Sequence, residues 1–272
     1  MQQTVFITGA SSGIGKATAL LFAQRGWQVA ATMRNSVQET ELTREGNIRL
    51  YRLDVTKPEE VKETVEKSIR EMGGIGVMVN NAGYGLAGPV ETASEEKIYR
   101  QFNTNLFGTI RTMQAVLPHM RENKQGVIIN ITSIGGLITL PYNAIYHATK
   151  FGLDGLSESM NYELAEFGIR VKTVAPGGVE TDFASRSLEM TTNKNEASPY
   201  DATLQKVWSA FMERTRVQSA PRQIAEVIYT AATDGTDQLR YLAGEDAKQM
   251  YQAWKGMSNE DFLKMIKNNF GL

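Results

Sequence analysis

Residues 4–22 read TVFITGASSGIGKATALLF, and this stretch decides the fold. Its first residues are apolar and predict a short buried strand, and the apolar residues after Gly15 recur at helical spacing. Between them, Gly9 permits a tight turn, Gly13 lets the backbone approach a pyrophosphate at the positive helix N-terminus, and Gly15 lets helix and strand pack closely. The pattern indicates the opening of a dinucleotide-binding domain, although an ordinary glycine-rich turn shows the same letters.

The rest of the chain alternates between strand and helix patterns. Further strands are predicted at residues 28–33, 48–53, 75–79, 127–131, 171–175 and 239–242. This alternation is typical of an α/β protein with a parallel sheet. No linker or repeat interrupts it. We therefore expect one dinucleotide-binding and catalytic domain over residues 1–272, with residues 244–272 as a C-terminal helical extension.

The composition excludes several classes of function. The absence of cysteine rules out disulfides and thiolate catalysis, and two histidines cannot make a histidine-rich metal site, so we expect no metal. The net charge is −1 and the charges are interspersed, so the sequence gives no electrostatic indication that the protein binds nucleic acid or an anionic membrane. The first strand begins at Thr4, which leaves no room for a secretory signal, and no apolar run approaches a membrane span. We expect a cytoplasmic protein.

Residues 131–150 read ITSIGGLITLPYNAIYHATK and carry the candidate chemistry. Tyr146 and Lys150 are four residues apart, so on a helix they share one face. A neighbouring ammonium stabilises a phenolate and lowers its pKa from about 10, which would make Tyr146 a usable acid or base. Ser133 follows a predicted strand and would hydrogen-bond a substrate oxygen. The plainer interpretation is that Tyr146 packs and Lys150 is solvated.

The end of the second predicted strand bears on the choice of cofactor. An acidic residue there would bind the adenosine ribose and repel a 2′-phosphate. The sequence instead reads MRNS at 33–36, and the Arg34 guanidinium suits bidentate phosphate binding. We therefore favour NADP(H) over NAD(H). The alternative is that Arg34 is a solvated loop residue.

Other polar or small residues follow predicted strands or interrupt an apolar helix face. Asp54 and Val55 end the third strand, and the turn Asn81-Ala82-Gly83 ends the fourth, at the sheet edge where ligands bind. Asn105 interrupts the apolar stripe of a long predicted helix. A buried amide needs partners, so Asn105 is either a structural polar group or part of the site.

Taken together, these motifs resemble the short-chain dehydrogenase/reductase family over residues 4–243. The matching segments are the glycine motif at 8–15, the turn at 81–83, Asn105, Ser133, the pair Tyr146 and Lys150, and the turn Pro176-Gly177 followed by Thr181. The resemblance implies a single-domain Rossmann fold, a doubly wound parallel sheet of about seven strands with helices on both faces.

The resemblance also implies a mechanism. Tyr146 becomes the general acid or base, Ser133 the anchor of the substrate oxygen, Lys150 the residue that shifts the Tyr146 pKa and binds ribose, and Asn105 the holder of a relay water. Hydride passes between the nicotinamide and a carbonyl or carbinol carbon. The cofactor-binding residues implied are Gly9, Ser11, Ser12, Gly13, Ile14, Gly15, Arg34, Asp54, Val55, Asn81, Ala82, Gly83, Tyr146, Lys150, Pro176, Gly177, Val179 and Thr181. Many NADP-using members carry a basic residue where this chain has Ser12, which leaves Arg34 to recognise the phosphate.

Residues 79–90 and the region after Pro176 are similar, more weakly, to the steroid and retinoid branch, which implies a small apolar carbonyl or alcohol substrate. We expect Ser133, Tyr142 and Tyr146 to bind this substrate. We expect residues 179–219 to form a substrate-binding lid over Leu137, Ile138, Tyr142 and residues 84–86, and the protein to be a homo-oligomer, a dimer or tetramer. Three alternatives stay open: a non-catalytic dinucleotide-binding sensor or scaffold, an NAD-dependent alcohol dehydrogenase of the same family, and a nucleotide-sugar epimerase or dehydratase.

Overall fold

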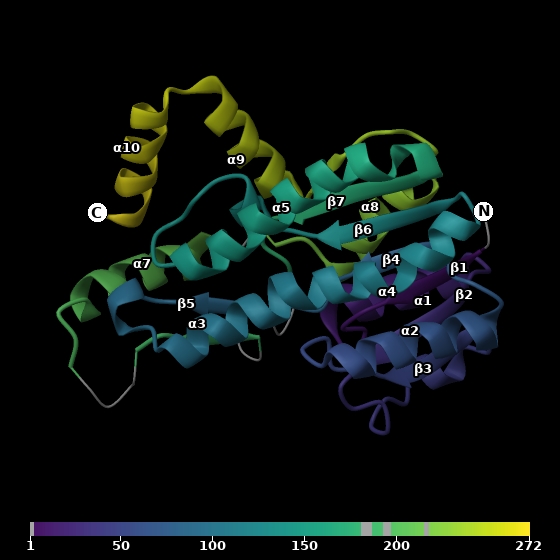
Figure 1. Cartoon of the computed structure of the whole chain (residues 1–272). Helices are drawn as coiled ribbons and strands as arrows, with labels where there is room; N and C mark the ends of the chain where they lie inside the picture. Colours follow the sequence, from purple (N-terminus) through teal and green to yellow (C-terminus); the bar gives the residue numbers. More distant parts are fainter. Residues whose placement is uncertain (1–2, 181–186, 193–196, 215–217) are drawn as a thin grey trace.

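The computed structural model describes residues 3–180, 187–192, 197–214 and 218–272. In this part of the chain seven strands form one parallel sheet in the order β3-β2-β1-β4-β6-β7-β9 (Figure 1). The strands are β1 (Thr4–Ile7), β2 (Gln28–Met33), β3 (Ile48–Arg52), β4 (Val77–Asn80), β6 (Gly126–Ile131), β7 (Ile169–Pro176) and β9 (Arg240–Ala243). The predicted Rossmann fold is confirmed. The strand order reverses at β1, which lies between β2 and β4, and such a switch point opens a crevice at the carboxyl ends of the strands.

Helices cover both faces of the sheet, which is why its strands are apolar on both sides. In β1, Val5 and Ile7 belong to one core cluster, under α1 (Gly13–Gln24) and α8 (Pro221–Thr233). Phe6 points to the other face and belongs to a second cluster. The helices that supply that second cluster are α2 (Pro58–Met72), α4 (Gly108–Glu122) and α5 (Ala144–Leu164). All three β1 side chains are fully buried, as the period of two requires for a strand covered on both faces.

The long helix predicted after Ser94 is one continuous run with a wider turn in its middle. Ser94 caps α3 (Glu95–Phe102) by accepting a hydrogen bond from the Lys97 N–H. A π-helical turn, η3 (Asn103–Phe107), then joins α3 to α4, and Asn105 lies within it. Short π-turns occur preferentially at functional sites, because the wider turn re-aims side chains and frees backbone groups.

A second, two-stranded sheet was not predicted. It pairs β5 (Gly85–Ala87) with β8 (Leu188–Met190) in parallel, outside the main sheet. At its end the Thr191 N–H donates to the Ala87 carbonyl at 2.8 Å. Glycine is required at position 88, because φ is +128° there and a Cβ would lie 2.1 Å from the Thr191 hydroxyl.

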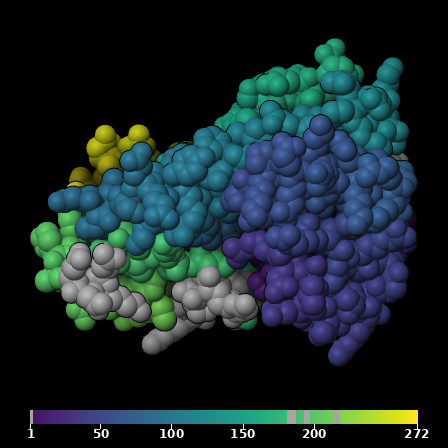
Figure 2. Space-filling view, turned by 60° about the horizontal axis from the view of Figure 1, so that its bottom comes forward, coloured from purple at the N-terminus to yellow at the C-terminus, as the bar shows by residue number. Residues whose placement is uncertain are grey.

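The C-terminal residues form α9 (Glu245–Gly256) and α10 (Asn259–Phe270), which lie at the same end of the molecule as α7 (Asp201–Arg214) (Figure 1). A third core cluster joins α7 and α10 to the segment after β6, and Phe211 contacts Phe270 with ring centroids 4.9 Å apart. Figure 2 shows the face on which the purple and blue N-terminal elements meet the green segment around α7. Within the described ranges, no helix has the length and apolar character needed to cross a membrane.

Candidate active site

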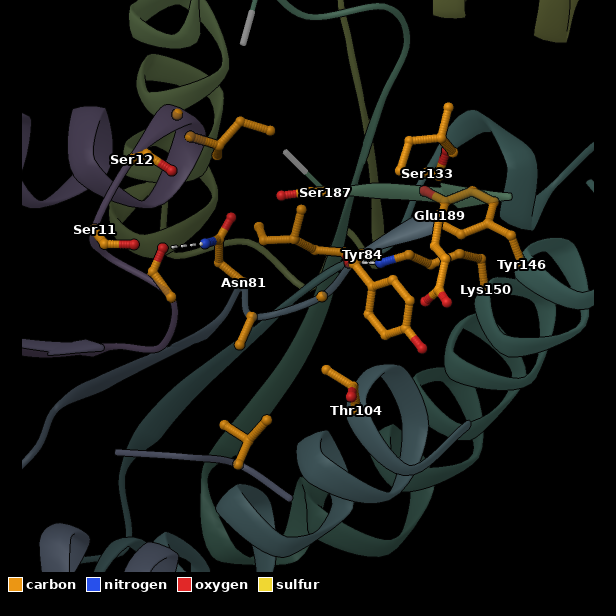
Figure 3. A pocket seen from close by; sticks show the side chains of 18 of the residues that line it. Ser11, Ser12, Asn81, Tyr84, Thr104, Ser133, Tyr146, Lys150, Ser187 and Glu189 are labelled. Atoms are coloured by element: carbon orange, nitrogen blue, oxygen red, sulfur yellow. Dashed lines mark hydrogen bonds between the residues drawn. The ribbon is translucent and has the colours of Figure 1, made fainter. Parts of the chain in front are cut away.

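A cavity of about 860 Å³ lies at the carboxyl ends of the strands (Figure 3). Its floor comes from the turns after β1, β2, β3, β4, β6 and β7, as expected for a doubly wound sheet. The predicted site residues that line it are Gly9, Ser11, Ser12, Gly13, Ile14, Arg34, Asp54, Val55, Asn81, Ala82, Gly83, Ser133, Tyr146, Lys150, Pro176, Gly177 and Val179. Residues from six separate turns therefore meet in one space.

The two glycine-rich turns are tied together at the switch point. The Asn81 side-chain N–H groups donate to the carbonyls of Thr8 and Gly9, both at 3.0 Å, and the Thr8 hydroxyl accepts from the Asn81 and Ala82 N–H groups at the same distance. Gly9 has φ of +68°, and a Cβ there would lie 2.9 Å from the Ala82 Cα. Gly15 lies behind the cavity wall, where a Cβ would be 2.3 Å from the Gly9 carbonyl oxygen. The glycines thus hold the turns in contact and leave the positive N-terminus of α1 open to the cavity.

The end of the cavity beside β2 and β3 contains Arg34 and Asp54. The Asp54 carboxylate accepts hydrogen bonds from the Thr56 N–H at 3.0 Å and hydroxyl at 2.7 Å. Burial, which raises the Asp54 pKa, is outweighed by these bonds and by the nearby charge of Arg34, so the pKa is lowered. Glu39 is held elsewhere, 3.1 Å from the Lys16 ammonium. Within the described residues Arg34 forms no ion pair, so its guanidinium is available to an anion in the cavity.

Ser133, Tyr146 and Lys150 stand together at the other end (Figure 3). The Lys150 ammonium donates to the Ile131 carbonyl at 2.8 Å and lies 5.7 Å from the Tyr146 ring centroid. Burial lowers the pKa of Lys150 to about 8. Burial also raises the pKa of Tyr146, and a hydrogen bond with Ser133 offsets only part of that rise. The lowering of the Tyr146 pKa that the sequence predicted from Lys150 is therefore not met in this structure, because desolvation dominates and the ammonium is committed to a carbonyl.

Asn105 lies behind the cavity wall and is 1% exposed. Its side-chain oxygen accepts from the Tyr84 N–H at 3.0 Å, and its N–H groups donate to the Tyr84 carbonyl at 2.9 Å and the Thr149 hydroxyl at 3.3 Å. Thr149 belongs to the same helix as Tyr146 and donates to its carbonyl at 2.7 Å. The amide thus connects the π-turn, the turn after β4 and α5. Its part in a water relay stays a prediction.

The wall opposite the glycine turns is more polar than predicted. Arg100 on α3 forms an ion pair with Glu189 on β8, and both line the cavity. One turn earlier on α3, Lys97 donates to the Met190 carbonyl at 2.8 Å. Tyr84 also lines the cavity (Figure 3), and burial raises its pKa. The sequence did not predict this polar wall, because Arg100 and Glu189 are 89 residues apart. The one local signal was the spacing of Lys97 and Arg100, which places two cations on the same face of a helix.

Some predicted site residues lie elsewhere. Tyr142 was predicted to bind substrate, but it packs against the third core cluster together with Ile138 and does not line the cavity. The reason is local: φ at Tyr142 is +58°, and its carbonyl accepts from the Gly88 N–H at 2.7 Å, which ties this segment to the end of β5. Thr181 lies outside the described residues, as do parts of the predicted lid at 181–186, 193–196 and 215–217.

Comparisons with known proteins agree with this geometry. The sheet and the cavity define a Rossmann-fold oxidoreductase, and the family model described as short chain dehydrogenase matches residues 3–192. The chain belongs to the short-chain dehydrogenase/reductase family.

Two of the relatives are named for a keto compound and for retinol. The chain is 42% identical over 195 residues to the 3-ketodihydrosphingosine reductase of Bacteroides thetaiotaomicron, covering 71% of each chain. It is 34% identical over 240 residues to retinol dehydrogenase 8 of Bos taurus, covering 83% of this chain and 76% of that one. Among solved structures, ElxO with NADP bound has a TM-score of 0.76 and 29% identity, and the match covers 93% of this chain and 100% of that one.

Proposed function

We propose that this protein is an NADP(H)-dependent oxidoreductase that interconverts a carbonyl and an alcohol, with Tyr146 as general acid or base. The observation that carries the proposal is the meeting of Ser133, Tyr146 and Lys150 with an open helix N-terminus in one cavity. A dinucleotide pyrophosphate fits the N-terminus of α1, because Gly13 stands at that N-terminus and lines the cavity. The bound cofactor would supply or accept the hydride.

The protein's own residues then handle the substrate oxygen. In the direction of reduction, the Tyr146 hydroxyl gives its proton to the oxygen that becomes the alcohol, and Ser133 holds that oxygen by a hydrogen bond. In oxidation the same proton returns to Tyr146. The hydrogen bond with Ser133 offsets part of the desolvation that raises the Tyr146 pKa, and the Lys150 ammonium lies 5.7 Å from the Tyr146 ring centroid.

The preference for NADP(H) over NAD(H) rests on Arg34. Its guanidinium lines the adenosine end of the cavity, and the neighbouring carboxylates of Glu39 and Glu41 are both paired with Lys16. A 2′-phosphate would meet a cation there, and the Asp54 carboxylate at that end accepts hydrogen bonds from Thr56. The solved structure of ElxO with NADP supports this choice by similarity.

The substrate class follows from the walls of the cavity. We propose a molecule with an apolar body and a polar group that faces Arg100 and Glu189, since Leu188, Tyr84 and Tyr99 line the cavity beside this ion pair. Two relatives named for a keto substrate and for retinol support carbonyl and alcohol chemistry on such a molecule.

The test is a nicotinamide absorbance assay with NADPH and NADH against long-chain ketones, aldehydes and their hydroxylated or aminated analogues. We expect NADPH consumption with at least one amphipathic carbonyl compound, and none by the Tyr146→Phe protein. Tight binding of NADPH without turnover of any carbonyl or alcohol would favour the non-catalytic sensor instead.

A further inference from the structure

His147 follows Tyr146 on α5 and is 5% exposed. Its Nδ1 contacts the Gly135 carbonyl oxygen, and its Nε2 lies 3.0 Å from the Leu140 N–H. A carbonyl only accepts a hydrogen bond and an N–H only donates one. The two bonds therefore assign the ring hydrogen to Nδ1, and Nε2 is the acceptor. Burial lowers the pKa of His147, which keeps the ring neutral.

Both bonds of His147 end on the same loop, the segment 133–140 that follows β6. Gly135 is held from two sides, because its N–H also donates to the Ser133 hydroxyl oxygen at 3.0 Å. The contact is tight: a Cβ at Gly135 would lie 2.6 Å from His147 Cε1 and 2.7 Å from Nδ1. The position of the imidazole and the position of the Ser133 hydroxyl are thus linked through one residue.

On its other side the loop packs against the third core cluster through apolar side chains. Ile138 belongs to the third core cluster, and Ile134 and Leu140 pack against it. Apolar packing holds a loop against the core but is not directional, so it permits small rotations of the peptide groups. Hydrogen bonds to defined atoms fix the orientation of those groups. The Ser133 hydroxyl oxygen accepts a hydrogen bond from the Gly135 N–H. The hydroxyl hydrogen therefore points away from Gly135 and can be donated to Tyr146 or to the substrate oxygen.

We propose that His147 is a positioning residue that, through Gly135, orients the Ser133 hydroxyl for the substrate oxygen. This inference rests on the proposed function, because it concerns the same reaction. His147 itself does not line the cavity and touches no reacting atom.

Three substitutions separate this role from a purely structural one. His147→Phe keeps a planar ring and removes both hydrogen bonds. His147→Asn keeps a donor near the place of Nδ1, and His147→Gln keeps an acceptor near the place of Nε2. A matched control is Ser157→Ala on the same helix, since Ser157 is also buried and makes two hydrogen bonds, from Asn130 at 2.9 Å and to the Leu153 carbonyl at 2.6 Å.

We expect the substitutions at His147 to change kcat while the Kd for NADPH stays nearly the same. Because small misplacements of a catalytic group cost up to about 10²-fold, we expect His147→Phe to lower kcat by about tenfold or more. Its Kd for NADPH, measured by fluorescence, should stay within about twofold of the unaltered value, because the cofactor cradle is untouched. His147→Asn should recover most of kcat, His147→Gln should not, and Ser157→Ala should lower Tm without lowering kcat.

Two results would overturn the proposal: an unchanged kcat in a folded His147→Phe protein, or recovery by Gln equal to or better than recovery by Asn. If His147→Phe does not fold, the kcat values of the other two proteins test the proposal, and kcat is expected to be higher in His147→Asn than in His147→Gln. An unaltered enzyme that turns over no carbonyl or alcohol would reject the proposed function, and the positioning role with it.

Discussion

Replacing Asp234 by alanine is expected to remove the partner of a buried lysine at the edge of the sheet. Lys172 on β7 is 1% exposed, and its ammonium lies 2.6 Å from Asp234 Oδ1. It also donates to the Tyr241 hydroxyl at 3.0 Å, and that hydroxyl donates to Asp234. Within the described residues Asp234 is the one carboxylate that pairs with Lys172.

The magnitude follows from the Asp234 pKa. Burial raises this pKa but is outweighed by hydrogen bonds from Lys172, Tyr241 and the Thr236 N–H, so it falls from 3.8 to about 2. That difference corresponds to about 2 kcal/mol of stability at neutral pH. The folded pKa is below the unfolded one, so this stability is present above about pH 4 and is lost as the pH falls toward 2. Asp234→Ala also leaves the Lys172 charge unpaired, so we expect a total loss of about 3–5 kcal/mol at pH 7.

The assay is urea unfolding followed by circular dichroism at pH 7 and pH 3. The control is Asp237→Ala, because Asp237 pairs with Arg170 at 2.8 Å but is 92% exposed, and such a pair is worth below about 1 kcal/mol. We expect the difference between Asp234→Ala and the unaltered protein to shrink at the lower pH. A loss no larger than that of Asp237→Ala, or one independent of pH, would refute the reasoning.

Three further predictions concern turnover. Tyr146→Phe should lower kcat by about 10²–10⁴-fold with nearly unchanged NADPH affinity by fluorescence titration, whereas Lys150→Ala should damage both; near-normal kcat in the Tyr146→Phe protein would contradict the acid or base role. Arg34→Ala should raise the NADPH KM about 10–100-fold, and adding Met33→Asp should shift preference toward NADH, whereas equal kcat/KM for both cofactors in the unaltered enzyme would show that Arg34 is not a phosphate ligand. In the direction of reduction, kcat/KM should fall as the pH rises through about 8, because Lys150 loses its charge there, and this limb should move to higher pH in Lys150→Arg.

The main sheet was predictable because β1, β2, β4 and β6 are short, mainly apolar runs that lead into turn residues. The strand at Gln28–Met33 and the helix end at Met72 have their predicted limits, since both are marked by local signals that need no tertiary information. The residues of the site were predictable for a related reason. They follow strands, and parallel strands bring their carboxyl ends to one edge.

The rest depends on contacts that no local pattern encodes. β5 and β8 have three residues each and pair across about a hundred residues of chain, so neither carries a readable period. Tyr142 was predicted to bind the substrate under the lid, whereas a positive φ and the third core cluster decide its position. The polar partners of His147 are likewise set by a loop whose path only the fold defines.

The π-turn at Asn103–Phe107 changes the direction in which the side chains before it point, relative to those after it. An α-helix advances about 100° per residue, and a π-turn holds one residue more, so α3 is rotated by about that angle relative to α4. α3 can therefore present Tyr99 and Arg100 to the cavity while α4 buries Met113 and Val116 against the sheet. Because of this offset, substitutions along α3 can change the lining of the cavity while the apolar stripe of α4 stays the same, so the cavity can vary without loss of the core.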